Sequence, residues 1–434
     1  MKYFSTNHKS EKASFKDAVI KGLAPDRGLY FPESISPIPN GFLDNGKELT
    51  EICYQYIKQF VGDEIPPDVL RKITAETINF PLPIVPIEKE VYSLELWHGP
   101  TCAFKDVGAR FLARCLSYFI QDQKETVTIL VATSGDTGSA VANGFFNVPG
   151  INVVILYPKG KVSKIQEQQL TTIGGNISAL EIDGTFDDCQ DMVKSAFNDK
   201  ELNAAMKLSS ANSINVARFL PQAFYFIAAY EQLENKKKDL VFAVPSGNFG
   251  NLTAGMFAQK AGLPVSKFIA GTNVNDIVPK YLAKGVYEPK PSISTISNAM
   301  DIGDPSNFAR IIELHNGNWE SVKNTLVGYS YNDEQTRQSM KKVIESTGYL
   351  TEPHGTIAYM ALKEYQKNHD CQGIILETAH PAKFHDVVEP EIGRKVEIPE
   401  RLKEYLHREK DALLMSNKFE SLKTYLLEES SKTA

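Results

Sequence analysis

Lys105 is the first residue of this sequence whose type and position could do chemistry. It follows the stretch Trp97-His98-Gly99-Pro100, which joins a β-type run at 92–96 to apolar residues that recur at helical spacing from Phe104 to Tyr118. We therefore expect Lys105 in the first turn of a helix, where a cation is unfavourable. The helix dipole and a closed environment would both favour the neutral amine, which is a nucleophile and a base. The alternative is an ordinary solvated lysine.

Three polar loops, each directly after a predicted apolar strand, are the next candidates. They are 133–139 after the strand 126–132, 245–251 after the strand 240–244, and 377–384 after the strand that ends at Leu376. Parallel sheets bind ligands at the carboxyl ends of their strands, so this common position predicts a shared site.

The loop 133–139 offers an anion site. Its residues Ser134, Gly135, Asp136 and Thr137 lie directly before a predicted helix. Glycine permits close approach of the backbone, and the free N–H groups of a helix N-terminus could hold a carboxylate or a phosphate. The alternative is a tight turn with a helix cap.

The loop 245–251 is a stronger candidate for a phosphate. Its core Ser246-Gly247-Asn248-Phe249-Gly250-Asn251 combines small and polar residues before a predicted helix. The loop matches neither the GxGxxG nor the GxxxxGK[ST] pattern, so a dinucleotide or a nucleoside triphosphate is not favoured. A purely structural turn stays open as the alternative.

The loop 377–384 supplies a hydroxyl rather than a charge. Thr378 could form a hydrogen bond with a heteroatom of a buried ligand. His380 and His385 lie nearby, but no HExxH pattern or cysteine set accompanies them, so we expect structural histidines and no metal site.

A further polar segment, 209–218, opens an apolar helix. Asn212, Ser213, Asn215 and Arg218 are the donors that suit an anionic group of a substrate. A capped helix with a surface arginine is the alternative.

Together these features predict a site for pyridoxal 5′-phosphate. The lysine would form the Schiff base, the glycine-rich loop would hold the 5′-phosphate, and the lone hydroxyl would meet the pyridine nitrogen. The combination is more specific than any one of its parts.

The elements that would position these residues alternate between strands and helices. Short apolar β-branched runs separated by helices predict an α/β fold with parallel sheets covered on both faces. Pro221 should interrupt the helix expected at 216–233. We expect a mostly helical N-terminal extension at 1–80, a larger lobe built from 81–125 and 207–434, and a smaller lobe at 126–206. The last 35 residues should form a polar surface helix with a frayed end.

The composition is that of an ordinary soluble globular protein. The 434 residues are 42% hydrophobic and 23% charged, and the formal net charge of -6 gives no electrostatic reason to expect nucleic acid or an anionic membrane. We find neither a membrane-spanning apolar run nor a secretory signal. The five cysteines form neither a disulfide framework nor a metal pattern, which favours the cytoplasm.

The motifs resemble those of the threonine synthase family, which has the two-lobed fold type II of pyridoxal-phosphate enzymes. The resemblance covers most of the chain and rests on Gly22-Leu23-Ala24-Pro25-Asp26-Arg27-Gly28-Leu29-Tyr30, on 98–106, and on the segments 134–138, 212–218, 246–251, 352–354 and 378–384, which occur in the family's order. It implies that Lys105 carries the cofactor, that Gly247, Asn248, Phe249, Gly250 and Asn251 bind its phosphate, and that Thr378 faces its pyridine nitrogen.

The resemblance also implies the substrate contacts. Ser134, Gly135, Asp136 and Thr137 would hold the substrate α-carboxylate, and Asn212, Ser213, Asn215 and Arg218 would bind the substrate phosphate. Many relatives of this fold carry asparagine at the position of Asp136, where it contacts the cofactor 3′-oxygen.

The activity implied is a lyase reaction that converts O-phospho-L-homoserine and water to L-threonine and phosphate. Lys105 would move protons at Cα and then at Cβ. A neutral partner such as Thr378 would leave the pyridine nitrogen unprotonated and moderate the electron sink. We expect a monomer or homodimer that acts on a small molecule without nucleic acid or membrane.

Two alternatives remain. One is a serine or threonine dehydratase of the same fold, which the anion-binding segment 212–218 and the N-terminal motif 22–30 disfavour. The other is a non-catalytic relative that binds a phosphorylated metabolite, against which the intact Lys105 argues.

Overall fold

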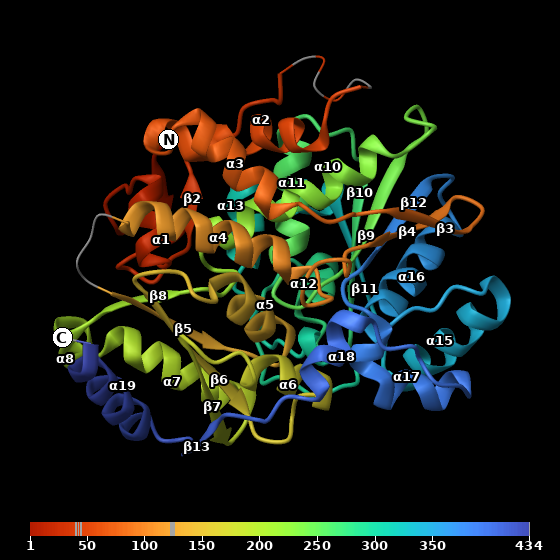
Figure 1. Ribbon diagram of the computed structural model, residues 1–434. Coiled ribbons are helices and arrows are strands. Elements are labelled where there is room, and N and C mark those ends of the chain that lie inside the picture. Colours follow the sequence, from red (N-terminus) through yellow and green to blue (C-terminus); the bar gives the residue numbers. More distant parts are fainter. Residues whose placement is uncertain (40, 42, 44–45, 122–125, 434) are drawn as a thin grey trace.

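Two sheets form the framework of this protein, and an N-terminal extension packs against one end of it (Figure 1). The computed structural model describes residues 1–39, 41, 43, 46–121 and 126–433. The extension holds the short antiparallel pair β1 (Tyr3–Ser5) and β2 (Tyr30–Pro32), which the sequence did not predict, and the helices α1 (Phe15–Lys21), α2 (Leu49–Val61), η1 (Gly62–Glu64) and α3 (Pro67–Thr77). Ser14 and Asp17 form a capping box at α1, and Pro67 begins α3, where its missing N–H costs nothing.

The larger sheet has six strands in the order β11-β10-β9-β12-β4-β3. They are β3 (Ile84–Glu88), β4 (Val91–Glu95), β9 (Leu240–Pro245), β10 (Lys267–Thr272), β11 (Leu326–Ser330) and β12 (Gln372–Glu377). All neighbours are parallel except β3 and β4. The helix α16 (Pro353–Gln366) packs on β9, β10 and β12.

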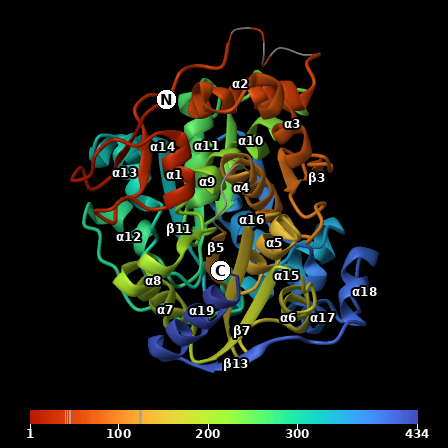
Figure 2. The ribbon, with the colours of Figure 1, turned by 60° about the vertical axis from the view of Figure 1, so that its left-hand side comes forward.

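The second sheet has five parallel strands in the order β13-β7-β6-β5-β8. Its strands are β5 (Val127–Ala132), β6 (Ile151–Pro158), β7 (Ile177–Asp183), β8 (Lys207–Ser210) and β13 (Leu413–Ser416). Its helices are α5 (Asp136–Phe145), α6 (Lys164–Thr171), α7 (Phe186–Asn198), α8 (Lys200–Ala205) and α19 (Phe419–Thr433). Figures 1 and 2 show this sheet below the N-terminal helices, with α7 and α19 on its outer side.

The predicted division into lobes stays a prediction, and the strand pairing departs from it at two places. β8 and β13 fall within the range 207–434 that we assigned to the larger lobe, but both pair in the five-stranded sheet. The chain therefore returns to the smaller sheet at its C-terminal end, where α19 packs on α7 and α8. The predicted boundary at 125 lies in residues 122–125, outside the described residues, as does the last residue of the predicted frayed end.

The helices between the strands carry the residues of interest. Pro221 interrupts the predicted helix at 216–233 as expected, because the chain forms α9 (Val216–Phe219), the 3₁₀ helix η2 (Leu220–Gln222) and α10 (Ala223–Glu231) in succession. The remaining elements are α4 (Lys105–Ile120), α11 (Gly250–Lys260), α12 (Ile277–Lys284), η3 (Asn298–Met300), α13 (Phe308–Leu314), α14 (Trp319–Thr325), α15 (Asp333–Thr347), η4 (Pro381–Phe384), α17 (His385–Ile392) and α18 (Glu400–Leu406).

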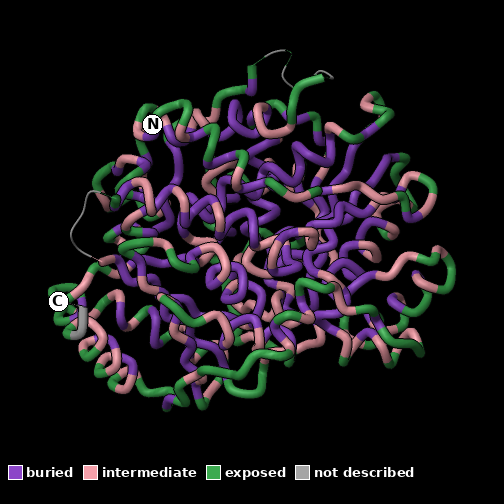
Figure 3. The backbone as a smooth tube through the Cα atoms, in the orientation of Figure 1, coloured by how far each residue is buried: buried purple, intermediate pink, exposed green. Residues whose placement is uncertain are grey.

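The largest cluster of buried apolar residues includes residues of the extension and of both sheets, and Figure 3 shows buried stretches through the interior of the molecule. Strands β5, β9 and β12 are buried along their whole length, as expected for parallel strands covered on both faces. Among the described residues, none of the helices is long and apolar enough to cross a membrane.

Candidate active site

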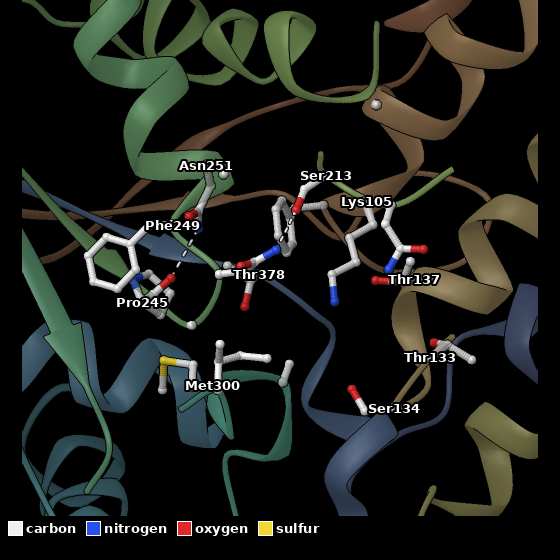
Figure 4. A pocket seen from close by; sticks show the side chains of 18 of the residues that line it. Lys105, Thr133, Ser134, Thr137, Ser213, Pro245, Phe249, Asn251, Met300 and Thr378 are labelled. Atoms are coloured by element: carbon white, nitrogen blue, oxygen red, sulfur yellow. Dashed lines mark hydrogen bonds between the residues drawn. The ribbon is translucent and has the colours of Figure 1, made fainter. Parts of the chain in front are cut away.

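The predicted loops and the segment 212–218 meet in one pocket between the two sheets (Figure 4). Most of the predicted residues line it: Lys105, Ser134, Thr137, Asn212, Ser213, Arg218, Gly247, Asn248, Phe249, Gly250, Asn251 and Thr378. The side chain of Lys105 extends into the open space between Thr378 on one side and Ser134 on the other. Residues that lie up to 273 positions apart in the sequence thus share one cavity, as the common position of the loops predicted.

Lys105 is the first residue of α4, as its position in the sequence predicted. The loop before it is tied to the loop of Thr378, because the Phe104 N–H donates to the Thr378 carbonyl over 2.8 Å. The pocket lowers the pKa of Lys105 to about 8 by removing water from the amine, and the cations of Arg218 and Lys383 add to this effect while Asp136 opposes it. A substantial fraction of the amine is therefore neutral near pH 8, as a nucleophile or a base requires.

The glycine-rich loop joins β9 to α11 and has the geometry of an anion site. Phe249 adopts a left-handed conformation with φ of 60°, and α11 begins at the next residue. The first N–H groups of a helix have no partner within it, so they are available to an anion. Gly247 lies so close to the loop above it that a Cβ atom would stand 2.6 Å from the Ala299 carbonyl oxygen and 2.7 Å from Met300 Cα. Only glycine fits there, which suits a backbone that must enclose a small group.

The asparagine side chains of this loop form hydrogen bonds within the protein. Asn251 Nδ2 donates to the Pro245 carbonyl over 3.0 Å and its Oδ1 accepts from Leu252 N–H over 2.9 Å. Asn248 Nδ2 donates to Ser213 Oγ over 2.8 Å. The side chains thus shape the loop, and the backbone N–H groups of 247–251 stay available to an anion.

The loop 134–137 separates into two parts. Ser134 and Thr137 line the pocket at the N-terminus of α5. The buried Asp136 carboxylate instead contacts Lys383 Nζ at 2.6 Å and accepts from Gln166 Nε2 over 2.9 Å. Although burial raises it, the pKa of Asp136 falls to about 2, because the cations of Lys383 and Lys105 stabilise the carboxylate.

The segment 212–218 presents two polar groups and a cation. Ser213 Oγ accepts from Asn248 Nδ2 and from Asn307 Nδ2, so its own hydrogen can be donated to a ligand. The buried Asn212 Oδ1 has no hydrogen-bond partner among the described residues. Arg218 is 3% exposed, and its guanidinium donates to the Lys105 carbonyl over 2.8 Å. Burial lowers the pKa of Arg218 to about 10, which leaves it charged at neutral pH.

Asn215 is placed differently from its neighbours. Its Nδ2 donates to the carbonyls of Val19 and Ser210, and its Oδ1 caps α9 by accepting from Ala217 N–H. These three bonds place Asn215 in the framework that joins the segment to the N-terminal extension.

The hydroxyl of Thr378 lines the pocket at the end of β12 and donates to Glu352 Oε1 over 3.1 Å. His380 caps η4 and its pKa falls to about 4 through burial and the nearby His98, which fits the structural role that we expected. No cluster of metal ligands occurs among the described residues.

Sequence reasoning missed three groups around the pocket. Lys383 is fully buried beside Asp136, although a lysine in a polar loop gives no sign of its burial. His354 lines the pocket from the start of α16, with the buried Glu352 hydrogen-bonded behind it, and the motif Glu352-Pro353-His354 was their only signal. The 3₁₀ helix η3 covers Gly247, and nothing in its sequence predicts that position.

The residues present fit the group that the sequence predicted. The pocket contains an amine with a lowered pKa, an enclosed set of helix N–H groups and the hydroxyl of Thr378. These are the parts that a site for pyridoxal 5′-phosphate needs. Arg218, whose guanidinium donates to the Lys105 carbonyl, lines the same pocket and adds a cation that would meet a second anion.

Comparison with known proteins agrees with a pyridoxal-phosphate enzyme. Residues 79–374 match the family of pyridoxal-phosphate dependent enzymes, residues 2–78 match the threonine synthase N terminus, and residues 355–426 match the threonine synthase C-terminal family. Threonine synthase from Escherichia coli (strain K12) is 44% identical over 407 residues, which are 93% of this chain and 94% of that protein.

Solved structures give the same result. The crystal structure of threonine synthase from Escherichia coli has a TM-score of 0.93 and 42% identity, and the match covers 99% of this chain and 100% of that one. A pyridoxal-phosphate-bound threonine synthase from Brucella melitensis has a TM-score of 0.91 and 34% identity, with 99% of each chain covered. The chain belongs to the threonine synthase family of pyridoxal-phosphate-dependent enzymes.

Proposed function

We propose that this protein uses pyridoxal 5′-phosphate to convert O-phospho-L-homoserine and water to L-threonine and phosphate. The observation that carries the proposal is that the pocket of Lys105 contains a buried cation, Arg218, in addition to the N–H groups at the start of α11. The N-terminus of α11 suits the cofactor phosphate, and Arg218 with Ser213 suits the phosphate of the substrate. A dehydratase acts on an uncharged hydroxyl side chain and has no need of that cation.

Each residue has a defined task in this proposal. The α5 N-terminus with Ser134 and Thr137 holds the substrate α-carboxylate, and Arg218 with Ser213 and Asn212 orients the phosphate that leaves Cγ. When bound, the cofactor withdraws electrons from the substrate carbon chain. Lys105 takes the proton from Cα and then from Cβ. The pocket lowers the pKa of Lys105 to about 8, so the amine can both remove a proton and return one. Water supplies the hydroxyl at Cβ, and a proton is added at Cγ.

We further propose that the enzyme works in the cytoplasm as a monomer or homodimer, without nucleic acid or membrane. All five cysteines are buried free thiols, as expected in a reducing compartment. Size-exclusion chromatography with light scattering would decide the oligomeric state.

The activity is tested by incubating the purified protein with O-phospho-L-homoserine and, separately, with L-threonine. We expect phosphate and threonine in equal amounts from the first and little product from the second. Formation of 2-oxobutanoate from threonine as the main activity would support a dehydratase instead.

The role of Lys105 is tested by Lys105→Ala. We expect this variant to lose turnover and also the absorbance band of lysine-bound cofactor at roughly 410–430 nm. A variant that retained both would exclude Lys105 as the cofactor lysine and would leave the non-catalytic alternative open.

A further inference from the structure

The direction of the Ser213 hydroxyl hydrogen is set by groups outside the pocket that Ser213 lines (Figure 4). We propose that Asn307 and Arg310 hold the Ser213 hydroxyl as an obligatory hydrogen-bond donor to an ionised phosphate in the pocket. Both are then positioning residues that act through Ser213. The inference deepens the proposed function and rests on it, because that function brings a cofactor phosphate and a substrate phosphate into the pocket.

The first step concerns the amide of Asn307, which is fully buried. Its Oδ1 accepts from Arg310 Nη1 over 2.6 Å, and a guanidinium carries donors only. The oxygen of the amide must therefore face Arg310. The NH₂ group on the other side of the amide donates to Ser213 Oγ over 3.0 Å.

The second step concerns Arg310, which holds this orientation in place. It is fully buried, and its guanidinium also donates to the carbonyls of Tyr30 over 3.2 Å, Ser213 over 3.1 Å and Ile214 over 2.6 Å. Burial lowers the pKa of Arg310 to about 9, which leaves it charged at neutral pH. Among the ion pairs of the described residues, none includes Arg310. A buried cation without a carboxylate is costly, so its position beside this segment calls for a task.

The third step concerns Asn248, the second amide at Ser213. Its Oδ1 accepts from the Ser306 N–H over 2.6 Å, and a backbone N–H can only donate. The NH₂ group of Asn248 therefore faces Ser213 Oγ and donates to it over 2.8 Å. Both amide orientations are thus fixed by groups that have no alternative role.

The fourth step concerns the hydrogen of Ser213. A hydroxyl has two lone pairs and one hydrogen, and both lone pairs accept from the two amides. Among the described hydrogen bonds, none has the Ser213 hydroxyl as donor, so its acceptor must come from the pocket. Ser213 Oγ lies beside the start of α11, where a Cβ atom on Gly250 would stand 3.6 Å from it, and the cation of Arg218 lines the same pocket.

An ionised phosphate fits these requirements. A phosphate monoester has a second pKa near about 6, so at neutral pH its terminal oxygens are mainly acceptors. The hydrogen bond from a fixed hydroxyl to such an oxygen is charge-assisted, and no free energy is spent on turning the hydroxyl.

The test is Asn307→Asp, which keeps the shape of the side chain. Its carboxylate still accepts from Arg310, but it replaces the NH₂ donor with an acceptor that takes the Ser213 hydrogen for itself. At saturating cofactor, KM for O-phospho-L-homoserine should rise roughly tenfold to hundredfold, as for the loss of a charged hydrogen bond. We expect kcat to change less than about fivefold, because the phosphate is already charged when the substrate binds. Tm should not fall, since the new carboxylate pairs with Arg310.

A double-mutant cycle with Ser213→Ala separates this effect from simple repulsion. If Asn307 acts through Ser213, adding Asn307→Asp to Ser213→Ala should raise KM less than about threefold further. A charge that merely repels the phosphate would raise KM equally with and without the hydroxyl, and that result would overturn the inference. Should Asn307→Asp fail to fold, Asn307→Ala takes its place in the same cycle.

Asn318→Asp is the matched control. It makes the same chemical change at an exposed residue that caps α14, where an aspartate caps equally well. We expect wild-type KM and Tm. A rise in KM as large as that of Asn307→Asp would mean that any added carboxylate suffices, and the inference would fall.

The cofactor Kd, measured by fluorescence titration, shows which phosphate accepts the hydrogen. A raised KM with an unchanged Kd assigns it to the substrate phosphate, and a raised Kd with an unchanged KM assigns it to the cofactor phosphate. Both results support the arrangement, and a variant that changes neither quantity would overturn it. A failure of the proposed function is seen separately, as absence of threonine formation by the wild-type protein, and the cofactor Kd of the variants then tests the arrangement alone.

Discussion

Lys383→Met tests whether the buried pair of Lys383 and Asp136 organises the site. Lys383 Nζ lies 2.6 Å from Asp136 Oδ1 and donates to the Thr101 carbonyl over 2.9 Å, and the two side chains are 0% and 5% exposed. Removing one partner of a buried pair leaves an uncompensated charge, which costs about 3–5 kcal/mol. For a chain of 434 residues that unfolds as one unit, this lowers Tm by roughly 3–6 °C.

The double variant Asp136→Asn with Lys383→Met makes the test sharper. Because neither charge remains, we expect it to be clearly more stable than either single variant, and the cycle measured by denaturant unfolding should give a coupling energy of about 2 kcal/mol or more. Additive losses within about 0.5 kcal/mol would refute the idea that the two charges depend on each other.

The single variant Lys383→Met has a second, electrostatic readout at Lys105. Lys383 lowers the pKa of Lys105 and Asp136 raises it, so removing Lys383 alone moves this pKa above about 8. Cofactor addition requires the neutral amine, and the pH at which apoprotein reaches half its maximal rate of cofactor binding should therefore rise in Lys383→Met. A midpoint that stays or falls would contradict the charge arrangement around the amine.

Three further predictions follow from single contacts. Arg218→Ala should raise KM for the phosphorylated substrate roughly tenfold to hundredfold, since a charged hydrogen bond is lost, while the cofactor Kd changes little; an unchanged KM would return Arg218 to a structural role. Gly247→Ala should weaken cofactor binding in a fluorescence titration, because its Cβ would meet Ala299 and Met300 at 2.6 and 2.7 Å. Gly250→Ala is the milder control, since its Cβ would lie 3.2 Å from Ser213 Cβ. Equal losses of cofactor affinity in the two variants would argue against close packing at Gly247. Burial raises the pKa of Asp301 from 3.8 to about 6, so this carboxyl takes up protons on folding and destabilises the folded protein more as pH rises from about 4 to 6. The free energy of unfolding of Asp301→Asn should therefore increase relative to that of the wild type across this pH range. A difference in unfolding free energy that does not change with pH would exclude the shift.

The sequence predicted the strands and loops that meet at the pocket because these depend on local pattern. Apolar runs such as 240–244 must be buried, and small polar residues after them must lie at the sheet edge, so β9 and its loop followed directly. Elements without such a pattern escaped prediction. β13 has only four residues, and it pairs with β7 from a position more than 200 residues later in the chain. No local signal predicts that pairing.

The pocket lining was likewise easier to predict than the groups that hold it. Arg310 shows why: its fully buried guanidinium donates to the carbonyls of Tyr30, Ser213 and Ile214. It thereby joins the N-terminal extension to the segment that faces the substrate. These acceptors are backbone atoms, which every residue has, so no pattern of side chains could identify them.

The pair of Lys383 and Asp136 also explains how an acidic residue can stand in a loop proposed to hold a carboxylate. A free aspartate at that place would repel the substrate. Because Lys383 lies 2.6 Å from Asp136, the pair is neutral as a whole, and the N-terminus of α5 keeps its attraction for an anion. The cations around Lys105 are thus divided between two tasks. Lys383 balances a charge of the protein, and Arg218, which donates only to a backbone carbonyl among its described hydrogen bonds, keeps its charge for the anion that enters the pocket.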